Sequence, residues 1–127
     1  MNLTENEISR IILDSCFDIH KELGPGIFES VYEEILYYEL QKKGLEVKRQ
    51  FPIAVNWKNE TMEMGFKADL VVEDKVIIEL KSVESLQAVH KKQLLTYLRL
   101  SIMKLGLLIN FNENLLKNGI KRIVNGL

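Results

Sequence analysis

"KADLVVEDKVIIELKS", residues 67–82, consists of two nearly apolar runs separated by the charged triplet Glu73-Asp74-Lys75. Apolar runs of this length are typical of strands buried on both faces, and a short charged break between them indicates a turn. The stretch therefore predicts two antiparallel strands joined by a hairpin. Three charged residues, Asp69, Glu79 and Lys81, interrupt the runs, and their presence needs a physical reason.

If the three charged residues are the whole loop, its length sets the expected register of the hairpin; a register shifted by one residue is the alternative. A three-residue loop places Val72 opposite Val76, and Asp69 then lies directly across from Glu79. Because side chains alternate between the faces of a strand, one face is wholly apolar and the other carries all three charges. The apolar face comprises Leu70, Val72, Val76, Ile78 and Leu80, and the other comprises Asp69, Val71, Ile77, Glu79 and Lys81.

Two opposed carboxylates repel each other. Their Cβ atoms are about 5 Å apart, and like charges at that distance repel by roughly 3 kcal/mol at an effective dielectric near 20. A protonated carboxyl, the ammonium of Lys81, or a hard cation between the oxygens relieves this repulsion. With a cation, the three side chains are suited to phosphodiester hydrolysis, because the metal acidifies a water and stabilises charge on phosphorus. Without one, they are solvated residues at the wet end of a half-exposed sheet.

The sequence up to Val72 predicts two helices and two strands, and the second of these strands is the first strand of the hairpin. A Thr4–Glu7 capping box and apolar residues at helical spacing favour a first helix, which Gly24-Pro25-Gly26 ends. A second helix is expected from Phe28 to Lys43. Alternating residues then predict strands over Leu45–Trp57 and Thr61–Val72. The second of these strands is expected to carry Met62, Met64, Phe66, Ala68 and Leu70 on one side.

The segments after the hairpin complete an α/β domain. A helix is expected over residues 86–100, a short strand over 104–110 and a weak final strand over 120–124. The order α-α-β-β-β-α-β-(β) predicts a mixed sheet flanked by helices. A chain of 127 residues fits one domain, so we expect residues 1–127 to share a single core.

Composition limits the possible partners. The formal net charge of −1 argues against a strongly basic nucleic-acid-binding domain, so any anion site must be local. The single Cys16 is expected in the core of a reduced, cytoplasmic protein. No apolar stretch approaches the roughly 18 residues of a membrane span, so no membrane partner is expected.

Two further groups of polar residues are candidates for a site. On the helix after the hairpin, His90, Gln93 and Tyr97 form one polar stripe. The stripe either faces a phosphate or the waters of a metal, or it is a hydrogen-bonded edge of the helix. For His90 taken by itself, the hydrogen-bonded helix edge is the favoured interpretation. In the second helix, Glu29 lies one turn from Tyr32, with Glu33 beside them; Glu29 either completes a metal site or caps its own helix.

Basic residues provide candidate phosphate contacts. Lys91 and Lys92 flank the polar stripe and are candidates for gripping a nucleic-acid backbone. A second basic cluster is interpreted as a solvated face, because charge runs of this size usually are. It consists of Lys42, Lys43, Lys48 and Arg49.

The motifs together resemble a known family. Asp69, followed by Glu79-Leu80-Lys81 and then Gln93-Leu94-Leu95-Thr96-Tyr97, resembles the PD-(D/E)xK nuclease superfamily in its Gln-x-x-x-Tyr branch. The run from Gly26 to Tyr32 matches the motif of the small GxxExxY family within it. The resemblance extends from about Ile8 to Val124, with Ala68 in place of the usual proline.

This resemblance implies a restriction-endonuclease-like core and cleavage of nucleic acid, DNA more than RNA, with Mg²⁺ or its substitute Mn²⁺. It implies that Lys81 positions the attacking water, and that Gln93 and Tyr97 contact substrate or order the site. The implied metal ligands are Asp69, Glu79, the Leu80 carbonyl and Glu29. The expected nucleic-acid contacts are Lys91, Lys92, Tyr32 and His90.

Two other functions are open on the same fold. The first is a catalytically inactive module that binds nucleic acid or protein, and the second is a structural or assembly protein. Because a core of this size has little surface for gripping a duplex, a homodimer is a further expectation.

Overall fold

The computed structural model describes residues 2–127, apart from the side chains of Glu63 and Met64. The expected placement of Met64 therefore lies outside the described residues. The observed order of elements confirms the predicted one. The elements are α1 (Glu5–Leu23), α2 (Glu29–Lys42), β1 (Val47–Trp57), β2 (Glu60–Val72), β3 (Val76–Lys81), α3 (Ala88–Ser101), β4 (Leu105–Asn110), the 3₁₀ helix η1 (Leu116–Gly119) and β5 (Ile120–Val124).

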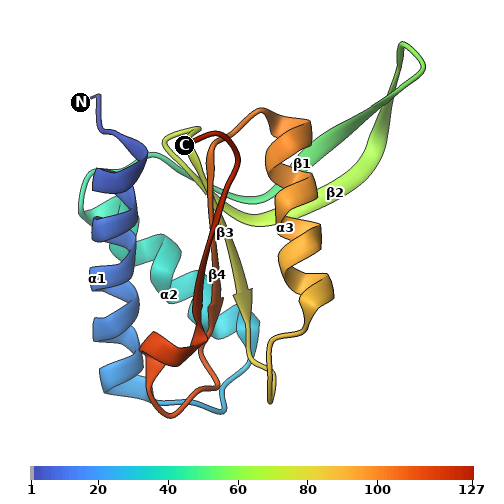
Figure 1. Ribbon diagram of the computed structural model, residues 1–127. Coiled ribbons are helices and arrows are strands. Elements are labelled where there is room, and N and C mark those ends of the chain that lie inside the picture. The colour runs from blue at the N-terminus through green and yellow to red at the C-terminus, as the bar shows by residue number, and fades with distance from the viewer. Residues whose placement is uncertain (1) are drawn as a thin grey trace.

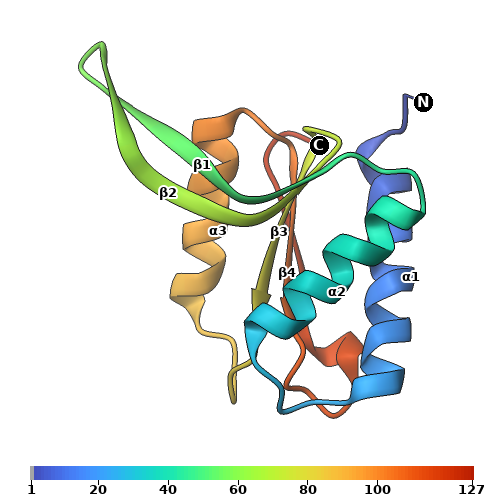
Figure 2. The same ribbon diagram turned by 180° about the vertical axis from the view of Figure 1, so that it is seen from behind.

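The described strands form one mixed sheet in the order β1-β2-β3-β4-β5. Neighbouring strands are antiparallel except β3 and β4, which are parallel and connected through α3. Helices α1 and α2 cover one face of the sheet and α3 covers the other (Figures 1 and 2). This confirms the α/β class with helices on both sides of a mixed sheet. Within residues 2–127, no helix is long and apolar enough to cross a membrane.

Each face of the sheet has its own hydrophobic cluster. The first lies under α1 and α2 and contains all five residues of the predicted apolar face of the hairpin. The second lies under α3 and contains Val71 and Ile77. Val72 pairs with Val76, so the predicted register of β2 and β3 is also confirmed. Cys16 is fully buried in the first cluster, where burial raises the pKa of its thiol.

The long β1–β2 hairpin projects beyond the body of the protein (Figure 1). Its tight turn has positive φ at both Lys58 and Asn59, as turns that match the twist of the strands require. The prediction that β2 keeps one apolar side is wrong. Leu70 packs under α1 and α2, whereas Phe66 and Ala68 pack under α3.

At one position on each strand of the hairpin, the side chains that would pack under α1 and α2 pack under α3 instead. We call this position the exchange of faces. On β2 it falls at Asp69. On β1 it falls at Gln50, which lies across from Asp69 because Arg49 pairs with Leu70 and Phe51 pairs with Ala68. Gln50 has φ of 46°, a left-handed conformation that residues other than glycine seldom adopt. The hairpin thus passes from one core to the other at the Gln50–Asp69 pair.

Candidate active site

Asp69 and Glu79 meet where β2 separates from β3. The last ladder pair of the two strands is Leu70 with Ile78. Beyond it, the Leu80 N–H donates to Asp69 Oδ2 at 2.8 Å, and the Asp69 N–H donates to Glu79 Oε2 at 2.7 Å. Each carboxylate therefore binds the backbone of the opposite strand in place of a ladder bond. The two acidic side chains that the register predicted to converge are brought together.

The two carboxyls hinder each other's ionisation. Burial, followed by the charge of Asp69, raises the pKa of Glu79 to about 8. Burial also raises the pKa of Asp69, against the opposing effect of its hydrogen bond from the Leu80 N–H. The charge of Lys81 lowers the pKa of both carboxyls, so its ammonium lies within electrostatic range of the pair.

The raised pKa of Glu79 predicts a pH-dependent effect of Glu79→Gln on stability. With a folded-state pKa of about 8 against an ordinary 4.5, the folded protein binds more protons than the unfolded chain between these values. Stability from this group therefore falls as pH rises through that range, by at most about 1.4 kcal/mol per pH unit. Glutamine does not titrate, so the metal-free variant should gain stability relative to wild type as pH rises.

Urea unfolding from about pH 5 to about pH 8 measures this difference. Glu84→Gln, at an exposed position after β3, is the matched control and should show no such trend. A stability difference between wild type and Glu79→Gln that stays constant across this range would show that Glu79 titrates normally.

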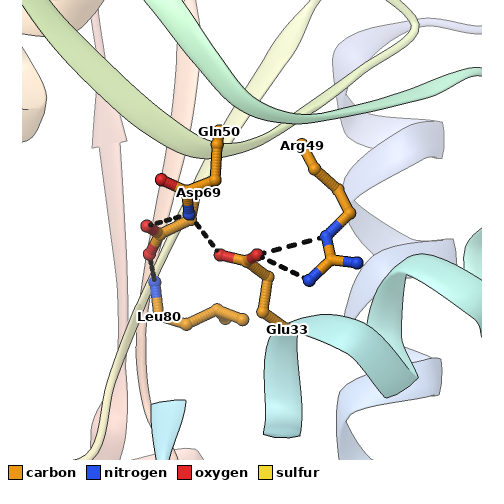
Figure 3. Close-up of polar contacts among 5 residues, drawn as sticks. All are labelled: Glu33, Arg49, Gln50, Asp69 and Leu80. Atoms are coloured by element: carbon orange, nitrogen blue, oxygen red, sulfur yellow. Dashed lines mark hydrogen bonds and ion pairs between the residues drawn. The ribbon is translucent and has the colours of Figure 1, made fainter. Parts of the chain in front are cut away.

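A third carboxylate, Glu33 of α2, is linked to Asp69 through the Gln50 amide (Figure 3). Arg49 Nε and Nη2 donate to Glu33 Oε2 at 3.2 and 3.1 Å. Gln50 Nε2 donates to the other oxygen, Oε1, at 2.7 Å, and lies 3.4 Å from Asp69 Oδ1. One amide group thus connects Glu33 to Asp69. Glu33 is nearly fully buried, whereas Arg49 and Gln50 are exposed, so solvent reaches this network from the β1 side.

Glu29 is not the carboxylate that α2 directs toward Asp69. It is exposed in the first turn of α2 and lines a hollow with Ser82 and Asn112. The charge of Glu33, one helical turn or about 6 Å further along, acts on both Asp69 and Glu79. The expected grouping of Glu29 with the pair is therefore corrected to Glu33.

Tyr32 belongs to the core and not to a nucleic-acid surface. Its fully buried ring stacks on Phe111 with centroids 4.3 Å apart. Its hydroxyl donates to the Gly24 carbonyl at 2.6 Å and accepts from the Ile27 N–H at 3.3 Å. Because no part of the side chain is exposed, the expected contact between Tyr32 and nucleic acid is wrong. Tyr32 instead fixes the turn between α1 and α2.

The stripe on α3 is divided between the site and the surface. Tyr97 is nearly fully buried, and its ring lies 5.0 Å from that of Phe66. Burial raises the pKa of Tyr97, and the charges of Glu79 and Asp69 raise it further, so its hydroxyl is near the pair. Gln93, one turn earlier, is exposed, as are Lys91 and Lys92.

His90 has a structural partner. Its Nδ1 accepts from the Gln87 N–H at 3.0 Å and closes a capping box at the start of α3. The interpretation of His90 as part of a hydrogen-bonded helix edge is therefore confirmed. This bond leaves the other ring nitrogen, Nε2, as the atom through which His90 would contact a ligand.

The second basic cluster is dispersed among separate partners. Lys43 donates to Ser15, Lys48 to Asp74 and Arg49 to Glu33. These contacts support its interpretation as an ordinary surface. Arg49 is the exception, since its partner belongs to the site. Sequence analysis missed Arg49 and Gln50 as site residues, and the available signal was three successive polar residues, 48–50, within an alternating strand.

The donor set suits a hard divalent cation. Carboxylate and carbonyl oxygens are the ligands that Mg²⁺ and Mn²⁺ prefer. Asp69 and Glu79 provide two carboxylates whose raised pKa values a cation would lower. The N–H and C=O of one residue in a strand point to the same side, so the Leu80 carbonyl faces the same gap as its N–H. Within the described residues, no group of three or more His, Cys, Asp or Glu is close enough to hold a metal by itself.

A family model described as the PD-(D/E)XK nuclease superfamily matches residues 6–123. No curated protein and no solved structure is significantly similar to the chain. The match covers almost the whole chain and includes Asp69, Glu79 and Lys81. It does not distinguish the GxxExxY family, so that narrower assignment stays a prediction. The fold, the convergence of the acidic pair and the family match agree, and the chain belongs to the PD-(D/E)XK nuclease superfamily.

Proposed function

We propose that this protein is a metal-dependent nuclease that hydrolyses phosphodiester bonds. The proposed site lies between β2 and β3. One observation carries the proposal: Asp69 and Glu79 exchange hydrogen bonds with each other's strand, which sets a half-buried and a buried carboxylate side by side within range of Lys81. Nuclease chemistry, divalent metal use and a nucleic-acid substrate are general properties of the superfamily. The residue roles, Mg²⁺ as the ion and DNA in preference to RNA are our proposals.

Asp69, Glu79 and the Leu80 carbonyl are proposed to hold the cation. When bound, a divalent cation lowers the pKa of a water and neutralises charge on phosphate oxygens. The Lys81 ammonium is then a donor that positions the attacking water. Glu33, held by Arg49 and Gln50, is the third acidic group next to Asp69, in the role first expected of Glu29.

The α3 side of the site is proposed to exclude water and to contact substrate. The nearly buried Tyr97 lies within electrostatic range of the pair and is proposed to lower the local dielectric, which strengthens electrostatic interactions there. Gln93, Lys91 and Lys92 are exposed on the same helix, where they are placed to contact the nucleic-acid backbone.

A catalytically inactive binding module on the same fold is the second candidate. It is favoured by the lack of a ready three-carboxylate cluster among the described residues. The homodimer and membership of the GxxExxY family are further proposals. The support for the dimer is the small surface of a core of this size, and the support for the family is the run from Gly26 to Tyr32.

Lys81→Met separates chemistry from metal binding. Labelled DNA and RNA incubated with the wild type should be cut in Mg²⁺ or Mn²⁺ and remain intact in EDTA. Lys81→Met should lower the cleavage rate by about 100-fold or more, because the donor for the attacking water is lost. The variant should still bind Mn²⁺, because removing a nearby positive charge does not weaken cation binding.

Lys104→Met, at an exposed position before β4, is the control and should cut at the wild-type rate. Wild-type cleavage by Lys81→Met would remove Lys81 from the mechanism. Nucleic-acid binding by the wild type without cleavage in either cation would favour the binding module.

A further inference from the structure

The outer face of α2 carries two aromatic rings with cations above them. The Arg49 guanidinium lies 5.2 Å from the centre of the Tyr37 ring, and the Lys42 ammonium lies 5.7 Å from that of Tyr38. Tyr38 is 60% exposed. Exposed aromatic rings next to cations are the groups with which proteins stack unpaired bases and hold their phosphates.

Arg49, Tyr37 and Tyr38 line a hollow of about 440 Å³, within the size range of small-ligand sites. Its lining combines flat apolar surface with polar groups. The residues are Glu34, Ile35, Tyr37, Tyr38, Gln41 and Arg49. The Gln41 amide donates to the Tyr37 hydroxyl at 3.1 Å, so both side chains present polar atoms at the same rim.

The hollow adjoins the hydrogen-bonded network of the candidate active site through one shared residue. Arg49 belongs to both, since its guanidinium binds Glu33 and lies over Tyr37. Glu33, Tyr37 and Gln41 are spaced at i, i+4 and i+8, so they form one stripe along α2 that begins at the site. The site network is exposed at Arg49 and Gln50, whereas Tyr97 is nearly buried on the other side. The network is therefore open to solvent on the β1 side, where Arg49 also borders the hollow on α2.

We propose that this hollow binds an unpaired base of single-stranded nucleic acid and leads the strand toward the Asp69–Glu79 site. The base stacks on Tyr38, and Arg49 and Lys42 contact its phosphates. Single strands are favoured because a duplex hides the base faces that such rings contact. The inference rests on the proposed nuclease function, since it names the form of nucleic acid that reaches the same site.

The hollow also contains a negative charge that repels a nucleic-acid strand. The proposal therefore predicts one substitution that strengthens binding and one that weakens it. The exposed Glu34 carboxylate repels phosphates at the rim. Glu34→Gln should therefore strengthen single-strand binding, whereas Tyr38→Ala should weaken it by roughly 5-fold or more, because stacking contributes about 1–3 kcal/mol per base. Tyr38 is exposed, so its replacement should leave thermal unfolding unchanged.

The test is fluorescence anisotropy of a labelled oligothymidylate, and of a blunt duplex, in EDTA so that neither is cut. Trp57→Ala is the matched control. Trp57 is 61% exposed and has the Lys58 ammonium 5.4 Å from its ring, but it lies at the tip of the β1–β2 hairpin. The Trp57→Ala variant should bind the oligothymidylate as tightly as the wild type does.

Equal single-strand affinities for wild type and Tyr38→Ala would overturn the inference. The inference would also be overturned if Trp57→Ala lost as much single-strand affinity as Tyr38→Ala, or if Tyr38→Ala lost as much affinity for the duplex as for the single strand. Absence of single-strand binding by the wild type would overturn it too. The two proposals fail separately. Cleavage with unaltered binding in Tyr38→Ala refutes only the α2 site, whereas the predicted binding pattern without cleavage in any cation refutes only the nuclease.

Discussion

Asp69→Asn is expected to lower cation-dependent cleavage by about 1000-fold or more while the protein remains folded. The carboxylate charge provides one of the two proposed anionic ligands, and its loss removes stabilisation that the transition state needs. The Asn side-chain oxygen still accepts the Leu80 N–H, so the backbone contact between β2 and β3 is kept. Loss of the Asp69 charge reduces the rise in the pKa of Glu79, which favours the variant's folding at neutral pH.

Single-turnover cleavage of labelled nucleic acid in Mn²⁺ measures this effect. Asp74→Asn, in the turn of the same hairpin, is the matched control because it removes an exposed carboxylate that pairs with Lys48. It should cut at the wild-type rate. If Asp69→Asn kept more than about a tenth of wild-type activity, the catalytic role of Asp69 would be refuted.

Tyr32→Ala is expected to lower the free energy of unfolding by about 3–5 kcal/mol, in the range found when large aromatic side chains are removed from cores. The Tyr32 ring is fully buried and its stacking partner Phe111 is buried too, so removal of the ring leaves a cavity in the core next to Phe111. Tyr32→Phe keeps the ring and loses the hydroxyl bonds to Gly24 and Ile27, for a loss of about 1–2 kcal/mol.

Urea unfolding measures both changes, with the exposed Tyr38→Phe as a control that should differ from wild type by less than about 0.5 kcal/mol. Tyr32→Phe should bind nucleic acid as tightly as wild type. Weaker binding by Tyr32→Phe, with stability unchanged, would restore Tyr32 as a nucleic-acid contact and contradict its structural role.

The register of the β2–β3 hairpin could be predicted from the length of its loop. A three-residue loop places Val72 opposite Val76, and the alternation of side chains then collects five apolar residues on one face. That register was enough to predict the convergence of Asp69 and Glu79. The motif on α3 likewise located Tyr97 beside the pair.

The position of the third carboxylate could not be predicted in the same way. Glu29 and Glu33 lie on one stripe of α2, and only the docking of the helix on the sheet decides which of them reaches Asp69. The exchange of faces at Gln50 and Asp69 was also hidden, because an alternating pattern contains no information on a left-handed φ at Gln50. Residue type alone did not indicate that the Tyr32 hydroxyl has backbone partners.

The central claim is that Asp69 and Glu79 together hold one divalent cation. Titration of Mn²⁺ into the metal-free protein, followed by the electron paramagnetic resonance of the free ion, tests it directly. The wild type should bind one ion per chain, and Glu79→Gln should bind it about 100-fold more weakly or not at all, because one of two anionic ligands is gone. Equal Mn²⁺ binding by wild type and Glu79→Gln, or no binding by the wild type, would contradict the claim.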